Sequence, residues 1–483
     1  MTAGRRLIAA LLCVLCFASF SCPACTTILV GKDVSPTGRV IVGHNEDDAG
    51  EITVSHYYVP PRDWEEDYIL PSDFFRADIP QVPHTFGYYW SEVKDEGAGV
   101  SYADSFYNDN GVYIASNSCA DSREDEWDFS TLTDGGIEYN LRRIVAERAT
   151  SARDGVDIII SLINEWGYGP SGRAYTVADK DEAWIVQIVH GRQYIAIRCP
   201  DDQVAVIPNH YTAHNPSDYA DVLYPETLIS FAKERGYWSE ADGPFDFAKA
   251  YQAPYSYMVE RNTLRNTYAL SMITGTPFTG ETYPFSVTPD RKIGLDDIAA
   301  VLSSHYEGTE NFPATEEAPH NTDTRTICYG TTAESTIVEF AEKPLLSTLW
   351  VAFGNPCVMP YVPLHPLAGV PRSLGHRTDP SSAMDSHLEY DWEEAGEKEN
   401  GIWQKMQDIL EQIDGEYALF SPAVKKANAG ARQTEVILNG AAVEKAAGLL
   451  DSGEEKEARN ALASADAKAL SRAFGRLYNA MNY

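Results

Sequence analysis

Positive charge and long apolar runs are both scarce in this sequence. Of its 483 residues, 38 are Lys or Arg and 71 are Asp or Glu, so the formal net charge is −33 at pH 7. So acidic a surface repels the phosphates of nucleic acids and anionic lipid headgroups, which argues against both as partners. With 44% hydrophobic and 23% charged residues, the composition is otherwise that of a globular protein long enough for a large core.

One apolar run does stand out, and it lies at the start of the chain. Arg5 and Arg6 precede an apolar stretch over residues 7–20, which is too short for an ordinary membrane span. The basic start, this stretch and the small residue Ala24 predict a secretory leader over residues 1–24. Its removal would take the net charge from −33 to −35, because the two arginines leave with it. We therefore expect a secreted or periplasmic protein with Cys25 at its mature N-terminus and no membrane span.

Cysteines are also few. Three of the 8 fall within the predicted leader, which leaves Cys25, Cys119, Cys199, Cys328 and Cys357. An oxidising compartment would permit two disulfides among the last four and leave Cys25 free, while buried reduced thiols are the alternative. Among the five there is no CxxC pair and no Cys/His spacing that indicates a zinc site. We expect neither a metal nor an organic cofactor.

Strand and helix patterns occur along the whole chain, which indicates an α+β fold. A hairpin is expected over residues 26–43, short strands with irregular connections over 51–100, and an antiparallel meander over 173–207. A strand is expected over 112–116, a strand pair over 336–340 and 347–353, and helices over 137–149, 156–166 and 296–305. The domain organisation predicted is a catalytic domain over 25–371, a polar linker or long loop over 372–400, and a helical C-terminal region over 401–483.

A thiol on an N-terminal residue lies beside its own α-amine. That amine has an unperturbed pKa of about 7.7–8, so near neutral pH it can accept the thiol proton without help from a distant histidine. Attack of the thiolate on an amide carbonyl produces an oxyanion that fixed N–H donors must stabilise, and water then hydrolyses the acyl-enzyme. Cys25 therefore indicates an amide hydrolase, provided that cleavage frees its amine.

Several segments carry a resemblance to a known family. Cys25-Thr26-Thr27-Ile28-Leu29-Val30-Gly31-Lys32, followed by Gly43-His44-Asn45-Glu46-Asp47, resembles the opening of the dipeptidase A-type family of bacterial cysteine peptidases. The likeness continues in the family's order through residues 110–112, 178–184, 198–209, 305–309 and 361–363. These peptidases are N-terminal-nucleophile hydrolases, distantly related to choloylglycine hydrolase and penicillin V acylase. The resemblance implies a four-layer αββα sandwich, with Cys25 at the end of an inner strand and a small peptide as substrate.

The resemblance also implies roles for individual residues. Cys25 matches the nucleophile, and Asp47 matches the acid that positions the N-terminal amine and thiol. Asn209 matches an oxyanion-hole residue of the amidase relatives. Asn117 is a candidate for the second oxyanion donor, with the serine on either side of it as the alternative.

Two basic residues complete the set of candidates. Arg265 matches a site arginine of the relatives, unless Arg261 takes that place or both lie on the surface. His44 stands where many relatives have arginine, and its imidazole titrates near neutrality whereas a guanidinium does not. If His44 lines the site, it makes activity pH-dependent or shifts substrate preference; the alternative is an ordinary loop histidine.

The leading functional hypothesis is an exported cysteine dipeptidase or small-peptide hydrolase. An amidase or acyltransferase acting on N-acyl amides would use the same nucleophile. A different class, a non-catalytic acidic lipoprotein or binding protein, is also open, because bacterial lipoproteins place a cysteine after a similar apolar run. Lipidation of Cys25 would consume its thiol and its amine. An oligomer of identical chains is compatible with the sequence.

Overall fold

The computed structural model describes residues 25–48, 52–71, 77–95, 100–118, 122–123, 128–138, 140–278, 283–312, 319–320, 324–372, 374, 379–387 and 402–482. The predicted leader, Cys119 and residues 388–400 lie outside these ranges. Cys25, Cys199, Cys328 and Cys357 are all free thiols, so two disulfides among the last four cysteines do not form. Among the described helices, none is both long enough and apolar enough to cross a membrane.

The strand that follows Cys25 lies inside a seven-stranded antiparallel sheet. β1 (Thr26–Val30) pairs with β2 (Ile41–Asp47) on one side and with β12 (Val204–Ile207) on the other. All residues of β1 and β2 are buried, which suits the β-branched and apolar run after Cys25. The order is β14-β12-β1-β2-β15-β16-β17, where the strands not yet given are β14 (Ser286–Val287), β15 (Thr332–Glu339), β16 (Thr348–Ala352) and β17 (Val362–Leu364).

A second, eight-stranded sheet packs against the first. Its order is β13-β11-β10-β9-β8-β7-β6-β3, and its neighbouring strands pair antiparallel. The strands are β3 (Ile52–Val59), β6 (Tyr88–Asp95), β7 (Val100–Asn108), β8 (Tyr113–Ser118), β9 (Tyr168–Ala178), β10 (Ala183–Gly191), β11 (Tyr194–Arg198) and β13 (Val222–Leu223). A separate two-stranded antiparallel sheet pairs β4 (Arg62–Asp63) with β5 (His84–Thr85).

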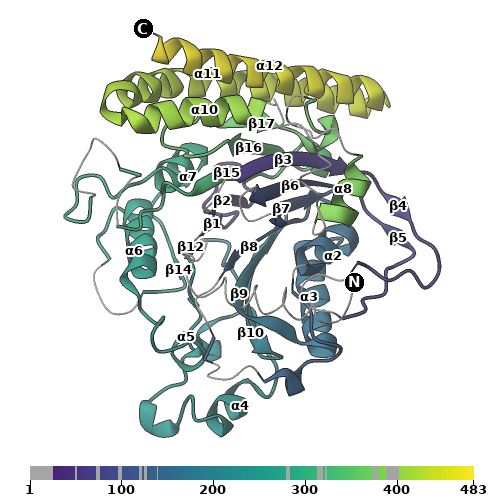
Figure 1. Cartoon of the computed structure of the whole chain (residues 1–483), viewed down its shortest axis with the longest axis vertical. Helices are drawn as coiled ribbons and strands as arrows, with labels where there is room; N and C mark the ends of the chain where they lie inside the picture. The colour runs from purple at the N-terminus through teal and green to yellow at the C-terminus, as the bar shows by residue number, and fades with distance from the viewer. Residues whose placement is uncertain are drawn as a thin grey trace, which may run out of the picture.

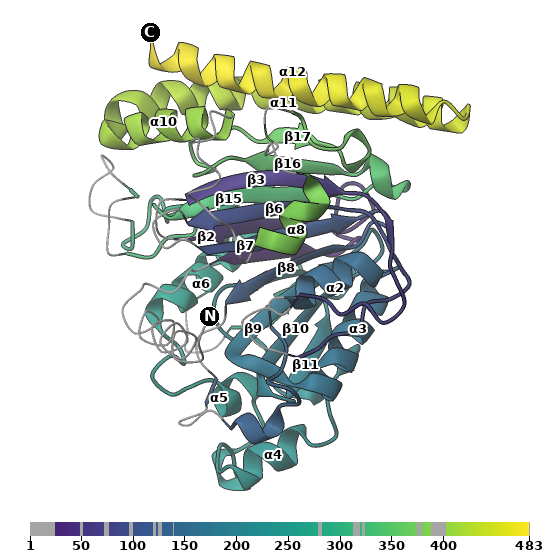
Figure 2. The ribbon, with the colours of Figure 1, turned by 45° about the vertical axis from the view of Figure 1, so that its right-hand side comes forward.

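Helices cover the outer face of each sheet. α2 (Asn140–Arg148) and α3 (Ala152–Trp166) pack on β7 to β10, whereas α6 (Glu260–Thr274) and α7 (Leu295–Leu302) pack on the first sheet (Figures 1 and 2). Gly43 on β2 permits the close approach of α7, because a Cβ there would lie 2.4 Å from Ile298 Cγ2. Two short helices, α4 (Leu228–Glu234) and α5 (Phe247–Tyr251), lie beyond the sheets. The αββα sandwich predicted for this chain is confirmed.

Three helices at the C-terminus lie along the β16–β17 side of the first sheet, in green to yellow at the top of Figure 1. They are α10 (Ile402–Gly415), α11 (Tyr417–Asp451) and α12 (Glu455–Met481). A buried hydrogen bond joins them to the sandwich, since Asp466 Oδ1 on α12 lies 2.7 Å from His365 Nδ1, just after β17. The helical C-terminal region predicted from the sequence is therefore present and docked.

Three regions differ from the sequence-based expectations. Residues 51–100 contain two long paired strands, β3 and β6, held by stacked aromatic rings such as Tyr57 on Trp90. The fourth strand of the predicted meander, β12, leaves its neighbours and joins the other sheet beside β1, where all of its residues are buried. Part of the predicted linker forms α8 (Pro380–Ser386), which packs on β3. Its Met384 is buried, and Asp385 pairs with Arg143 of α2 at 2.8 Å.

Candidate active site

Cys25 lies at the head of β1 and is only 2% exposed. Its thiol donates a hydrogen bond to Glu46 Oε2, with 3.2 Å between Sγ and the oxygen. Burial, and then the negative charges of Glu46 and Asp47, raise the pKa of this thiol well above its ordinary value. The resting side chain is therefore a protonated thiol, and a base must take its proton before it can attack a carbonyl.

The thiol belongs to a buried chain of charged groups. His44 Nε2 lies 3.2 Å from Glu46 Oε2 and 3.1 Å from Asp104 Oδ1, and its Nδ1 lies 2.7 Å from Thr27 Oγ1. Burial alone would lower the pKa of His44, but the charge and hydrogen bonds of Asp104 and Glu46 outweigh it and raise that pKa to about 10. Burial and the charge of Asp104 raise the pKa of Glu46 to about 7. His44 is thus a fully buried member of the site and not a loop histidine.

Asp47 lies on the opposite face of β2 from His44 and Glu46, because successive strand residues alternate. Its carboxylate accepts hydrogen bonds from Arg325 Nη2 and Thr332 Oγ1, both at 2.5 Å. Burial raises the pKa of Asp47, and the charge of Arg325 opposes that rise. Asp47 affects the pKa of the Cys25 thiol in two opposite ways. Its negative charge raises that pKa, whereas a hydrogen bond from its backbone lowers it. The thiol contact itself belongs to Glu46, a residue that sequence reasoning did not select.

Arg265 on α6 is the arginine that reaches the nucleophile. It is fully buried, and its Nη1 donates to the backbone carbonyl of Cys25 at 2.7 Å and to Asn209 Oδ1 at 2.8 Å. Its Nη2 donates to Asn262 Oδ1 at 2.5 Å. The alternative, Arg261, has an exposed side chain and contributes its backbone carbonyl as an acceptor for Arg265 Nε.

The two predicted oxyanion-hole asparagines both lie at this site, and both are fixed by neighbours. Asn209, just after β12, accepts from Arg265 and donates through Nδ2 to the carbonyl of Ser118 at 2.6 Å. Asn117 on β8 accepts from Thr27 Oγ1 at 2.7 Å and donates to the carbonyl of Ile207 at 3.0 Å. These bonds join β8 of one sheet to β1 and to the end of β12 in the other. The oxyanion role of each asparagine stays a prediction.

Two partners of the predicted site residues were not found by sequence reasoning. Asp104 comes from β7 of the other sheet, and Arg325 comes from the loop before β15. Neither lies in a motif with the residue it contacts, because the pairings Asp104–His44 and Arg325–Asp47 are made only by the fold. Glu46 did carry a signal, since the alternation of β2 places it on the same face as His44.

Two clusters within the described ranges bring metal-ligand atoms within 4.8 Å of one another. One is Cys25, His44 and Glu46 itself. There the Nε2 atom of His44 faces the carboxylates of Glu46 and Asp104, at 3.2 and 3.1 Å. The second cluster, made of His305, His320, Cys328 and Cys357, is separate from the nucleophile and is taken up below.

Known proteins resemble this chain over most of its length. A probable dipeptidase of Salmonella dublin is 27% identical over 368 residues, which cover 71% of this chain and 81% of the relative. A probable dipeptidase of Latilactobacillus sakei is 25% identical over 353 residues, or 70% of this chain and 73% of the relative. A probable dipeptidase B of Streptococcus pyogenes serotype M3 is 25% identical over 304 residues, and this chain spans 59% of its length.

Among solved structures, penicillin V acylase from Agrobacterium tumefaciens aligns with 71% of this chain and with 86% of the acylase chain, at 10% sequence identity and a TM-score of 0.36. A similarity this low adds no evidence about the fold beyond the strand order and layers described above. The model of peptidase family C69 matches residues 24–388, a range that begins beside Cys25 and includes the whole αββα sandwich. The resemblance seen in the sequence is thereby confirmed, and the chain belongs to peptidase family C69.

Proposed function

We propose that this protein is an exported cysteine dipeptidase whose nucleophile is Cys25, the N-terminal residue once the leader is removed. The observation that carries the proposal is the setting of Cys25: buried at the head of β1, with its carbonyl bound by Arg265 at 2.7 Å and its thiol 3.2 Å from Glu46. The family supplies the peptidase class, and the relatives named as probable dipeptidases supply the size of the substrate.

The α-amine of Cys25 is the group best suited to take the thiol proton. His44 does not fit that role, because its pKa near 10 leaves it protonated at neutral pH and its Nε2 faces two acids. A free α-amine has a pKa of about 7.7–8 and is attached to the same residue as the thiol. Leader cleavage before Cys25 would therefore create the base and the active nucleophile in one step.

The reaction then follows from the groups at the site. The amine takes the thiol proton, the thiolate bonds to the peptide carbonyl carbon, and the carbonyl electrons move to the oxygen. Asn209 and Asn117 are the candidate donors to that oxyanion. The ammonium of Cys25 returns its proton to the leaving amino group as the C–N bond breaks. Water, activated by the same amine, hydrolyses the thioester and restores the thiol.

The decisive assay compares unblocked dipeptides with N-acyl amides on the mature enzyme. We expect hydrolysis of the dipeptides, and Cys25→Ser should lose roughly 10³-fold or more in kcat/KM. The matched control is Cys199→Ser, which removes another buried thiol and should keep full activity. Retained activity in Cys25→Ser would exclude this nucleophile, and cleavage of N-acyl amides alone would contradict the dipeptidase assignment.

A further inference from the structure

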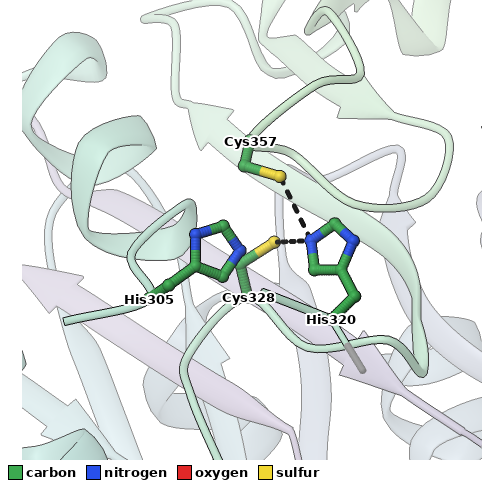
Figure 3. Close-up of side chains that lie close together, drawn as sticks. All are labelled: His305, His320, Cys328 and Cys357. Atoms are coloured by element: carbon green, nitrogen blue, oxygen red, sulfur yellow. Dashed lines mark hydrogen bonds between the residues drawn. The ribbon is translucent and has the colours of Figure 1, made fainter. Parts of the chain in front are cut away.

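Four metal-ligand side chains meet at a point that the proposed chemistry does not use. His305 follows α7, His320 and Cys328 lie in the chain before β15, and Cys357 follows β16. One ligand atom from each lies within 4.8 Å of the other three. Figure 3 shows the two sulfur atoms and an edge of each imidazole facing a common centre. His305 and Cys328 are fully enclosed at 1% and 0% exposure.

The spacing of the four groups fits a tetrahedral zinc ion. His320 Nε2 lies 3.2 Å from Cys357 Sγ and 3.6 Å from Cys328 Sγ. Tetrahedral zinc with bonds of about 2.3 Å to sulfur and about 2.1 Å to nitrogen separates neighbouring S and N ligands by about 3.6 Å. His320 and the two cysteine sulfurs therefore already lie near the separations that the ion requires, and the ligand atom of His305 lies within 4.8 Å of them.

The second nitrogen of each imidazole is held by a carboxylate. His305 Nδ1 lies 2.9 Å from Glu307 Oε1, and His320 Nδ1 lies 2.9 Å from Asp414 Oδ1 on α10. Such bonds keep the proton on Nδ1 and present the Nε2 lone pair to the centre, which is the arrangement found around protein-bound zinc. His305 Nε2 is buried, and the thiol of Cys357 is its polar neighbour in the cluster. Each imidazole thus has one nitrogen bound to a carboxylate and the other turned toward the cysteine sulfurs.

We propose that His305, His320, Cys328 and Cys357 bind one zinc ion. Four protein ligands close the coordination shell, so the ion is structural and leaves no position for substrate. Two thiolates and two neutral imidazoles favour zinc over the hard cations magnesium and calcium. Binding requires both thiols and both Nε2 atoms to be free of protons, so the protons that these four groups carry are released to solvent, and no electrons are transferred. The assignment of this site does not rest on the proposed dipeptidase activity.

The zinc site would tie the C-terminal helices to the catalytic sandwich. On one side, Asp414 of α10 orients His320, and Tyr417 OH of α11 lies 3.6 Å from Cys357 Sγ. On the other, Arg325 stands three residues before Cys328 and pairs with Asp47 beside the nucleophile. Loss of the ion should therefore loosen both the docked helices and the loop that carries Arg325.

The test is elemental analysis of the full mature protein, purified without chelator. We expect about one zinc per chain in the wild type. Cys328→Ser and His320→Ala should each lose most of it, whereas the matched control Cys199→Ser should retain it. Cys25→Ser should also keep its zinc, which separates this proposal from a failure of the proposed activity.

Two further measurements do not depend on the folding of the variants. Cobalt added to the wild-type apoprotein should produce the thiolate-to-metal absorption of a Co²⁺–thiolate site, and a strong chelator should lower the Tm of the wild type. A protein that contains no zinc and takes up neither zinc nor cobalt would overturn the proposal. So would a Cys328–Cys357 disulfide in the native protein, detected as a linked peptide pair by mass spectrometry.

Discussion

Replacing Arg265 removes the group that joins α6 to the nucleophile. Three short hydrogen bonds of its guanidinium, at 2.5–2.8 Å, go to buried acceptors around the site: the carbonyl of Cys25, Asn209 Oδ1 and Asn262 Oδ1. At about 1.5 kcal/mol for each hydrogen bond from a charged group, Arg265→Ala would lose about 4–5 kcal/mol of stability. Burial, and then the charge of Arg325, lower the pKa of Arg265 to about 10, so part of its desolvation is uncompensated. We therefore expect a net loss of about 3 kcal/mol.

The same substitution should impair catalysis in the molecules that remain folded. Freeing the carbonyl of Cys25 lets the nucleophile shift, and a displacement of about 1 Å can cost roughly 10²-fold in kcat. Arg265→Lys keeps the positive charge but lacks the planar guanidinium. Its stability and its kcat should therefore lie between those of the wild type and Arg265→Ala. Urea unfolding and dipeptide kinetics measure the two effects. The reasoning is refuted if Arg265→Ala loses less than about 1 kcal/mol, the size of an average substitution, and keeps its kcat.

Three other predictions concern buried charges. Arg325→Ala leaves the buried carboxylate of Asp47 without its charged partner, and should cost about 3–5 kcal/mol in urea unfolding. A loss within about 0.5 kcal/mol, as for a surface substitution, would contradict this expectation. Since the pKa of His44 is raised from 6.5 to about 10, its stabilisation is complete below pH 6.5 and is lost as the pH rises through about 10. Asp104→Asn should reduce the loss of stability between neutral pH and pH 10. An unchanged dependence of stability on pH would exclude the His44–Asp104 pair as its cause. Asp466→Ala removes the hydrogen-bond acceptor that lies 2.7 Å from His365 Nδ1, and should cost about 1.5–3 kcal/mol of stability. Amide hydrogen exchange in α12 should become faster, and unchanged exchange there would contradict the role of Asp466 in docking this helix.

The sequence predicted the parts of this protein that depend on local pattern. The β-branched run after Cys25 predicted β1, and the helical periodicity before Trp166 predicted most of α3. Cys25 itself could be selected because its position after an apolar leader has a direct chemical meaning. The resemblance to a family then supplied Arg265 and Asn209, which the fold places in contact with each other.

What the sequence did not reveal depends on contacts between distant segments. Asp104 faces His44 because two sheets pack face to face, and no spacing in the chain encodes that register. The cluster around Cys328 was missed for the same reason: its four ligands come from separate loops, so the usual short Cys/His spacing is absent. The strands β3 and β6 were underestimated because their polar and aromatic side chains obscure the alternation, although Trp90 and Tyr57 are buried.

Mass spectrometry of the N-terminal peptide of the exported protein tests the central claim most directly. The mechanism requires a chain that begins at Cys25, with a free α-amine and an unmodified thiol, because that amine is the base. We predict that this peptide is the mature N-terminus. A mature chain in which Cys25 is still internal, or carries a lipid on its thiol and amine, would contradict the account.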